Sequence, residues 1–429
     1  MRLLLSALVA LLAMPMTTTA DDATEAHALR LLREAPLIDG HNDMPYAIRD
    51  RVKNHVEQID FAGDTRKLAS PMHTDIARLR AGGVGAQFWS VWIPTDLAPA
   101  DAVKTVVEQI DVVHRVDARY PDAFALALTA DDVLRIHREG RIASMIGVEG
   151  GHSIGNSLAV LRQLYALGAR YMTLTHSKNT DWADSATDLP RSGGLTPFGK
   201  EVVREMNRLG MLVDLSHVAP STMKQAIEVS DAPVIFSHSS AFAITPHMRN
   251  VPDDVLATLK AKDGVVMVTF VGAFVSEEAR QWNASKDAEE ARLKALHPES
   301  EEARKAGLEA WTTANPQPTV TISQVADHVD HIRKVAGVEH VGIGSDFDGF
   351  SYPPVGLEGV QGYPALFAEL IRRGYTDDEV RAIAGRNLLR VWHKAEAVAA
   401  TLQKVKRASD VLIEDVDSPV KNESPTTHE

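Results

Sequence analysis

Short apolar runs alternate along the chain with longer stretches in which apolar residues recur three and four positions apart. The runs have the length of buried strands, and the longer stretches have the periodicity of amphipathic helices. Eight such runs are Pro36–Asp43, Val84–Trp92, Ile142–Gly151, Arg170–His176, Leu212–His217, Pro233–His238, Gly264–Phe270 and His340–Asp346. This order of elements is typical of parallel βα units.

The clearest helices follow the middle runs. They are predicted over Ser157–Leu167, Pro197–Leu209, Ser221–Val229 and Asp253–Lys262. Ser157 is suited to cap the first of them, and Thr196 before Pro197 is suited to cap the second. Eight parallel strands with covering helices favour a single α/β domain, a closed (β/α)8 TIM barrel, with a doubly wound open sheet as the alternative.

Two segments fall outside the repeated pattern. Residues 276–316 are rich in Glu, Lys, Arg and Ala, and they predict solvated helices inserted between the seventh and eighth strands. Residues 406–429 are polar and predict a disordered tail. The catalytic domain is therefore expected to span residues 21–405.

The first twenty residues have the pattern of an export signal. Arg2 precedes the apolar stretch Leu3–Pro15, and the small residues up to Ala20 form a cleavage site before Asp21. The apolar stretch is short for a bilayer, although an uncleaved anchor is the alternative. We expect removal of residues 1–20 and a soluble periplasmic or secreted protein without a stable membrane anchor.

Composition narrows the chemistry. The chain of 429 residues carries a net charge of −13 and contains no cysteine. The acidic balance disfavours nucleic acid as a partner, because a phosphate-binding surface is basic. Without cysteine, any zinc would have to be held by histidine and carboxylate side chains.

Ionisable residues gather where the predicted strands end. Six strands end in the residues His41 and Asp43, Glu149, His176, His217, His238 and Asp346. Active sites of (β/α)8 barrels lie at the C-terminal ends of the strands. Burying this many ionisable groups together is costly unless they share a partner, and a metal centre is such a partner.

The spacing of these residues predicts how metal ions would be held. His41 and Asp43 lie two residues apart on one strand face and can chelate one ion. His217 and His238 end neighbouring strands and can hold a second ion, and the two oxygens of Glu149 can bridge the pair. Nitrogen and oxygen ligands suit Zn²⁺, with Mn²⁺, Co²⁺ and Fe²⁺ as alternatives.

Seven motifs around these residues together resemble the membrane (renal) dipeptidase family. In the family's order they are Asp39-Gly40-His41-Asn42-Asp43, Gly147-Val148-Glu149-Gly150-Gly151-His152, Leu174-Thr175-His176-Ser177, Asp214-Leu215-Ser216-His217, Phe236-Ser237-His238-Ser239, Arg249-Asn250-Val251-Pro252-Asp253 and Gly344-Ser345-Asp346-Phe347-Asp348-Gly349. Each motif alone is weakly specific for the family. Seven motifs in the family's order over Leu37–Trp392 are together a specific signal.

The resemblance implies a two-zinc barrel enzyme that hydrolyses dipeptides, often accepts a C-terminal D-residue and commonly forms a homodimer. It assigns one zinc to His41 and Asp43 and the other to His217 and His238, with Glu149 as the bridge. It further implies that His176 contacts the substrate, that Arg249 binds the substrate carboxylate, and that Asp346 lies near the bridging water and the substrate amine. Glu149, His176 and Asp346 would then be the catalytic residues.

The chain also departs from the family. It has Thr269-Phe270-Val271 where animal members carry an aromatic hydroxyl, and residues 276–316 are an extra segment, so the preferred substrate side chains stay open. We expect His152 and Asp348 to give hydrogen-bonding support and no catalysis, and His247 and Trp392 to be structural.

Two other functions stay open. One is another barrel hydrolase that acts on a lactone, cyclic amide or phosphoester, substrates that do not need Arg249. The other is a binding protein that holds metal but has no catalytic activity. The presence of His176 and Asp346 beside the candidate ligands argues against this second alternative.

The mature protein is expected to begin at Asp21. Removal of residues 1–20 takes away Arg2 and changes the net charge from −13 to −14. Intact mass and N-terminal sequencing of the exported protein measure this. Recovery from the membrane fraction with Met1 retained would contradict it.

Overall fold

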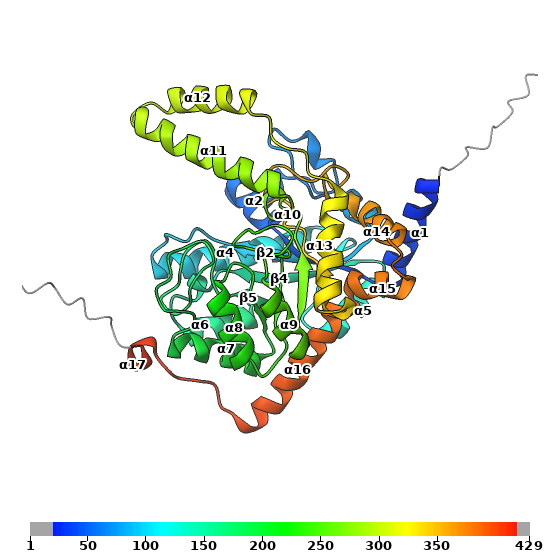
Figure 1. Ribbon diagram of the computed structural model, residues 1–429. Helices are drawn as coiled ribbons and strands as arrows, with labels where there is room; N and C mark the ends of the chain where they lie inside the picture. Colours follow the sequence, from blue (N-terminus) through cyan, green and yellow to red (C-terminus); the bar gives the residue numbers. More distant parts are fainter. Residues whose placement is uncertain (1–19, 418–429) are drawn as a thin grey trace, which may run out of the picture.

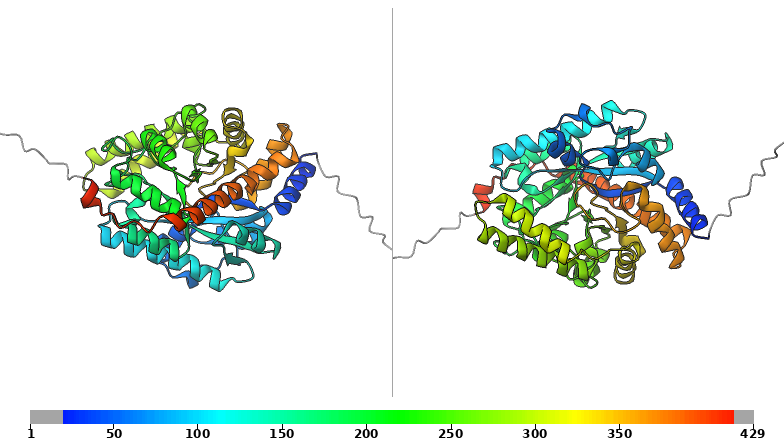
Figure 2. Two further views of the ribbon diagram at one scale, coloured as in Figure 1. Left: turned by 90° about the horizontal axis from the view of Figure 1, so that it is seen from below. Right: turned by 90° about the horizontal axis from the view of Figure 1, so that it is seen from above.

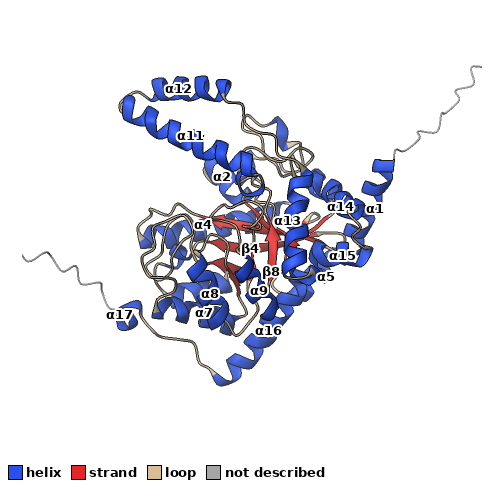
Figure 3. Ribbon diagram, in the orientation of Figure 1, coloured by secondary structure: helices blue, strands red, loops and turns tan. Residues whose placement is uncertain are grey.

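Eight parallel strands close into a barrel in the computed structural model, which describes residues 20–417 (Figures 1 and 3). The strands pair in the order β2-β1-β9-β8-β7-β6-β5-β4, and pairing of β2 with β4 closes the ring. The predicted barrel is confirmed, and the open sheet is wrong. The strands are β1 Leu37–Asn42, β2 Val84–Trp92, β3 Phe124–Leu126, β4 Ile142–Glu149, β5 Ala169–Thr173, β6 Leu212–Asp214, β7 Ile235–Phe236, β8 Val265–Val268 and β9 Val341–Ile343.

The strands differ from the prediction in two respects. Strand β3 was not predicted; it has three residues, pairs with the start of β4 and lies outside the closed ring. Strands β5, β6, β7 and β9 also end two or three residues before the predicted ends His176, His217, His238 and Asp346. His217 and Asp346 have φ angles of +69° and +70°, a left-handed conformation that cannot continue a strand.

Helices surround the barrel, as the views from below and above show (Figure 2). Their bounds are α1 Ala20–Glu34, α2 Met44–Val52, α3 Ile76–Ala81, α4 Pro99–Arg119, α5 Ala130–Arg138, α6 Leu158–Ala166, α7 Pro197–Leu209, α8 Pro220–Val229, α9 Asp253–Ala261, α10 Gly272–Val275, α11 Glu277–Leu296, α12 Glu301–Ala314, α13 Ile322–Val335, α14 Tyr363–Arg372, α15 Asp377–Arg381, α16 Asn387–Val405 and α17 Ile413–Val416. Ser157 and Thr196 cap α6 and α7 as predicted, because their hydroxyls accept from Val160 N and Gly199 N.

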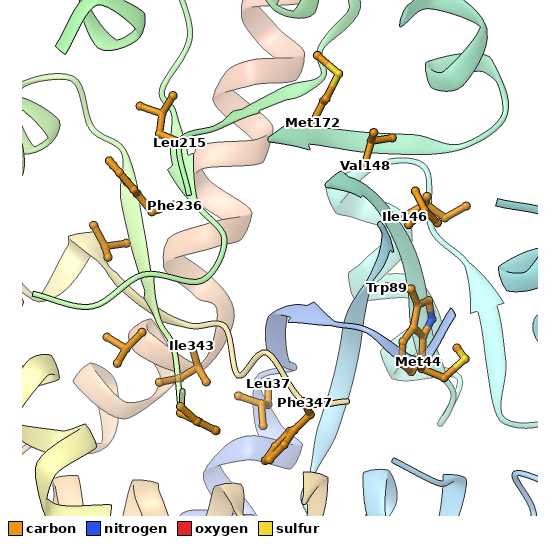
Figure 4. Packing of buried hydrophobic residues seen from close by; sticks show 14 of the residues in the cluster. Leu37, Met44, Trp89, Ile146, Val148, Met172, Leu215, Phe236, Ile343 and Phe347 are labelled. Atoms are coloured by element: carbon orange, nitrogen blue, oxygen red, sulfur yellow. The ribbon is translucent and has the colours of Figure 1, made fainter. Parts of the chain in front are cut away.

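Alternation along the strands divides the buried side chains into two apolar clusters. In β8, for example, Val265 and Met267 belong to the smaller cluster, and Val266 and Val268 belong to the larger. Figure 4 shows members of the larger cluster, among them Phe236 on β7. The smaller cluster includes Trp392 on α16, whose ring lies 5.8 Å from that of Phe88. Apolar packing on both faces thus fixes the strands whose ends carry the site.

Residues 276–316, between β8 and β9, form the helices α11 and α12, which project from the barrel as an arm (Figure 1). In α11 the buried residues are Ala279 and Leu293, and α12 has none, in agreement with the largely polar composition of the segment. The arm joins the barrel at α10, and α12 packs on α11.

The two chain ends are described in part. Residues 406–417, from the segment predicted to be disordered, follow the surface to Asp417, whose carboxylate accepts hydrogen bonds from Thr196 Oγ1 and Phe198 N at the start of α7. A carboxylate at a helix N-terminus is favoured by the helix dipole. Residues 418–429 and residues 1–19 of the predicted export signal lie outside the described residues. Within residues 20–417, no helix combines the length and the apolar composition that crossing a membrane requires.

Asp117 on α4 is expected to make stability depend on pH. Both carboxylate oxygens are buried, and burial raises the pKa of Asp117 to about 7, an effect that the nearby Ser144 side chain partly offsets. Because this pKa exceeds that of the unfolded chain, the stability of the native state falls as pH rises from about 4 to 7 and then levels off. Asp117→Asn should therefore gain roughly 1–3 kcal/mol over the wild type at pH 8, and this gain should shrink towards pH 4.

Urea unfolding of both proteins across this pH range measures the effect. Asp111→Asn on the same helix is the matched control, because the Asp111 side chain is 61% exposed and lies beside Arg115. A stability difference for Asp117→Asn that does not change with pH would contradict the assignment.

Candidate metal centre

The C-terminal ends of the strands bring the predicted ligands together around the carboxylate of Glu149. Its Oε1 atom lies 2.9 Å from Nε2 of His217 and 3.4 Å from Nε2 of His238. Its Oε2 atom lies 3.3 Å from Nε2 of His41, which is 3.4 Å from Oδ2 of Asp43. One carboxylate thus faces both predicted ligand pairs, with one oxygen towards each.

Three overlapping groups of side chains here have the spacing of a metal site. In each group the possible ligand atoms lie within 4.8 Å of one another; the groups are His41, Glu149 and His238; Glu149, His176 and His217; and His41, Asp43 and Asp346. The donors are imidazole nitrogens and carboxylate oxygens, a set that fits Zn²⁺ and related divalent ions. The residues present therefore fit a metal centre.

A tyrosine inside the barrel orients His41. Nδ1 of His41 lies 2.9 Å from the hydroxyl of Tyr171, and this hydroxyl donates to the carbonyl oxygen of Gly40 at 3.3 Å. Because the phenol hydrogen is used there, Nδ1 of His41 donates its own hydrogen to Tyr171. The opposite nitrogen, Nε2, is buried and has no hydrogen bond within the described part of the chain, which is the arrangement of a metal-binding histidine.

A second hydroxyl orients His238 in the same way. Ser237 Oγ donates to Asp214 at 2.6 Å and lies 2.8 Å from Nδ1 of His238, so this nitrogen carries a hydrogen and donates it. Nε2 of His238 is then left with a lone pair, 3.0 Å from Nε2 of His217. Asp214 is itself fixed by Thr173 Oγ1 and by the backbone N–H of Ser237.

Burial sets the charges of the imidazoles. It lowers the pKa values of His217 and His238 well below their usual range, so both rings stay neutral, as metal ligands must. Burial also lowers the pKa of His41, but Tyr171, Glu149 and Asp43 outweigh this effect and hold that pKa well above its usual range. In the metal-free protein His41 therefore takes up a proton, which a cation would displace.

The pKa values of the carboxyl groups of Glu149 and Asp346 are shifted in opposite directions. Burial raises the pKa of Glu149, but the positive charge on His41 and the other imidazoles outweigh it and hold this pKa well below its usual range. For Asp346, burial together with the negative charges of Asp43 and Glu149 prevails and raises the pKa well above its usual range. His176 is partly buried beside Glu149, at 3.6 Å, and its desolvation lowers its pKa to about 4. The centre therefore combines a proton-binding carboxyl, Asp346, with a protonated imidazole at His41 and neutral imidazoles at the other histidines.

The backbone is strained at two of these residues. His217 and Asp346 both adopt the left-handed conformation, which is unfavourable for a side chain with a Cβ atom. Gly349 follows in the same loop, and a Cβ atom built there would lie 2.3 Å from Asp43 Oδ2 and 2.6 Å from Asp346 Oδ1. The loop after β9 thus needs glycine at this position to approach the carboxylates.

A pocket of about 550 Å³ opens onto the centre, a size that suits a small ligand. It contains the predicted residues Asp43, Glu149, His176, His217, Arg249 and Asp346. Sequence reasoning missed the remaining wall, which includes Tyr46, Asp50, Arg51, Trp92, Phe274 and Phe350. A signal was present on α2, where Tyr46 and Asp50 are four residues apart directly after Asp43 and so share a helix face. Val271, from the motif that departs from the animal members, also lines the pocket.

Arg249 is a buried cation that lines this pocket. It is 3% exposed, its Nη2 donates to the carbonyl oxygen of His238 at 3.3 Å, and its Nε has no hydrogen-bond partner among the residues described. Its alternative partners are engaged elsewhere, Asp253 with His331 and Asp254 with Lys224. Burial lowers the pKa of Arg249 to about 10, so it stays charged at neutral pH.

The other motif residues support their surroundings. Nε2 of His152 lies 3.1 Å from the carbonyl oxygen of Ile93. Asp348 accepts from the backbone N–H of His73 at 2.7 Å. The ring of His247 packs on Phe274, with centroids 4.3 Å apart.

Comparisons with known proteins identify the family of the chain and relatives of its fold. Residues 25–406 match the membrane dipeptidase family, peptidase family M19. The probable dipeptidase PvdM from Pseudomonas aeruginosa is similar in structure, with a TM-score of 0.74, 23% identity, and coverage of 88% of this chain and 99% of that chain. A structure described as the dipeptidase AC, a metallopeptidase, has a TM-score of 0.69 at 25% identity, covering 84% of this chain and 98% of its own. A metallopeptidase from Rhodobacter sphaeroides, liganded with a phosphinate mimic of the dipeptide L-Ala-D-Ala, has a TM-score of 0.68 at 24% identity, covering 84% and 99%.

Tyr171→Phe is expected to weaken metal binding at His41 by about 10- to 100-fold, because Nδ1 loses the acceptor that orients the ring. Metal titration against a competing chelator measures the affinity, and elemental analysis gives the number of ions. Tyr375→Phe is the matched control, since Tyr375 is buried and donates to Asp330 at 2.7 Å away from the site. Equal metal affinity of the Tyr171 variant and the wild type would show that the hydroxyl does not position His41.

Proposed function

The chain belongs to the membrane dipeptidase family and is a metal-dependent dipeptidase, and we propose that it uses two zinc ions to hydrolyse dipeptides, including those with a C-terminal D-residue. The observation that carries the proposal is the carboxylate of Glu149, with Oε2 towards His41 and Oε1 towards His217 and His238. Mn²⁺, Co²⁺ or Fe²⁺ in place of zinc would use the same donors.

In this proposal His41 and Asp43 hold one ion, His217 and His238 hold the other, and Glu149 bridges them. Two ions bound there would supply an activated water and polarise the scissile carbonyl. A charged carboxylate suits the bridging position because it offers one oxygen to each side.

Two further side chains would act on the substrate. His176 would donate a hydrogen bond to the carbonyl oxygen as negative charge develops on it, and its position beside Glu149 in the pocket supports this role. Asp346 would accept the proton of the attacking water, pass it to the leaving amine and accept a hydrogen bond from the free α-amino group. The proximity of Asp346 to Asp43 and His41 supports the proton transfer.

Arg249 would bind the terminal carboxylate of the substrate and thereby select for length. A carboxylate pairs well with a guanidinium through two parallel hydrogen bonds. The free Nε of Arg249 and the absence of an ion pair to Asp253 or Asp254 support this role. The phosphinate mimic of L-Ala-D-Ala in the Rhodobacter sphaeroides metallopeptidase supports acceptance of a C-terminal D-residue.

Two rival functions are separable by substrate. A barrel hydrolase for lactones or cyclic amides would not need a buried guanidinium in the pocket, whereas one for phosphoesters could pair it with the phosphate. A metal-holding protein without catalysis would bind dipeptides without turnover. A screen of L,L and L,D dipeptides, with metal analysis of the same sample, separates the dipeptidase from both rivals, and turnover of a lactone, cyclic amide or phosphoester would identify the first rival.

We also propose that the enzyme is exported. The apolar stretch Leu3–Pro15 and the small residues before Asp21 support this, and the mature N-terminus tests it as described above.

Arg249→Ala is expected to lower kcat/KM for a dipeptide by about 30- to several-thousand-fold, equivalent to roughly 2–5 kcal/mol, because a carboxylate loses its charged partner. Metal content should stay unchanged, since Arg249 ligates no ion. The wild type should cleave the C-terminal amide of the same dipeptide poorly, and the variant should lose most of this preference for the acid. Both substrates are measured with both proteins.

Arg51→Ala is the matched control. Arg51 lines the same pocket but donates to the backbone carbonyls of Ser70 and Pro71, so the control should keep the preference for the acid. Equal discrimination between acid and amide by the wild type and the Arg249 variant would remove Arg249 from carboxylate binding and leave the metal chemistry standing.

A further inference from the structure

Asp348 places an unpaired carboxylate oxygen in the wall of the pocket. The side chain is 1% exposed. Its Oδ1 atom accepts the backbone N–H of His73 at 2.7 Å, whereas Oδ2 is buried and has no hydrogen-bond partner within residues 20–417. A buried charged oxygen without a donor is costly, so the site favours a ligand that brings one.

The carboxylate is held firmly in this position. The backbone N–H of Asp348 donates to Nδ1 of His73 at 2.9 Å, so the two residues are joined by two hydrogen bonds. The ring of His73 lies against Phe347 and Phe350, with centroids 5.4 and 5.6 Å away. Because these contacts already fix the carboxylate, little free energy would be needed to orient it when a cationic group binds Oδ2.

The free oxygen is not placed to hold the metal ions. None of the three candidate metal groups among the described residues includes Asp348, although Asp346 belongs to one of them. Asp348 nevertheless lines the same pocket as Arg249 and His176. Its position therefore points to the substrate as the source of the missing donor.

The pocket carries opposite charges at separate places along the barrel rim. Arg249 follows β7 and contacts His238, whereas Asp348 follows β9 in the loop that approaches Asp43. A dipeptide also carries opposite charges at its two ends, with the scissile bond between them. The substrate carboxylate at Arg249 would leave the ammonium group on the side of Asp348.

We propose that Asp348 is a substrate-binding residue whose Oδ2 accepts a hydrogen bond from the α-ammonium group of the dipeptide. This inference rests on the proposed dipeptidase function and deepens it, because it makes a free amino terminus a requirement of the site. An ammonium group has three hydrogens to donate, so Asp348 and Asp346 can both receive one.

Asp348→Asn tests this role because the amide keeps an oxygen for the N–H of His73 but replaces the charged acceptor Oδ2 with an NH2 group, which cannot accept from an ammonium group. The substrates are alanyl-alanine and propionyl-alanine, which has the same carbon skeleton without the amino group. The variant should lose about 10- to 150-fold in kcat/KM on alanyl-alanine and change little on propionyl-alanine, as expected for one hydrogen bond to a charged group. Asp50→Asn, which alters a less buried acid of the same pocket, should keep the wild-type discrimination.

Binding of phosphinate dipeptide mimics with and without the amino group gives a second measurement that needs no turnover. The wild type should prefer the amino form, and Asp348→Asn should lose most of that preference. Unchanged discrimination in both measurements, or an equal loss on both ligands, would overturn the assignment. Absence of dipeptide hydrolysis by the wild type would contradict the proposed function instead, while the binding measurement would still decide the role of Asp348.

Discussion

The structure depends on keeping one buried carboxylate, that of Glu149, at the centre of the barrel mouth. A charged group in this position would destabilise the fold unless cations or hydrogens surrounded it. His41, His217 and His238 approach it from three other strands or the loops that follow them, and Ser90 Oγ donates to it at 2.9 Å. The closed ring makes this convergence possible, because side chains from non-adjacent strands meet only where a sheet returns on itself.

The barrel wall adds a layer of polar residues that fixes this arrangement. Asp39 receives hydrogen bonds from Ser345 Oγ and Tyr363 Oη, both at 2.6 Å, and so ties β1 to the loop after β9 and to α14. Asp214 on β6 accepts hydrogen bonds from Thr173 Oγ1 and Ser237 Oγ, and so ties β6 to β5 and to the residue that follows β7. Asp39 also accepts from the backbone N–H of His41, and Asp214 holds the Ser237 hydroxyl that orients the ring of His238. Stability and function are therefore supported by the same hydrogen bonds.

The sequence made the closed barrel and the cluster of candidate ligand residues predictable for local reasons. Glu149 and His41 stand at the ends of apolar runs, and the polar position at such an end is visible in the chain itself. The part played by Tyr171 was not visible, because a tyrosine inside a strand reads as core until its neighbour across the barrel is known. The left-handed backbone at His217 was also hidden, since nothing in its residue type requires it. Tyr46 on α2 and Asp348 in the loop after β9 line the pocket because of how that helix and that loop pack in three dimensions, which the sequence does not reveal.

The arm formed by α11 and α12 has a consequence for how the molecule loses structure. With Ala279 and Leu293 as its buried residues, the arm has little apolar area to hold it to the barrel. Two helices of this length are marginal without such packing. The arm is therefore a separate cooperative unit, whose backbone amides exchange with solvent through local opening while the barrel stays closed. Cleavage by a protease would begin there and leave the catalytic ring folded.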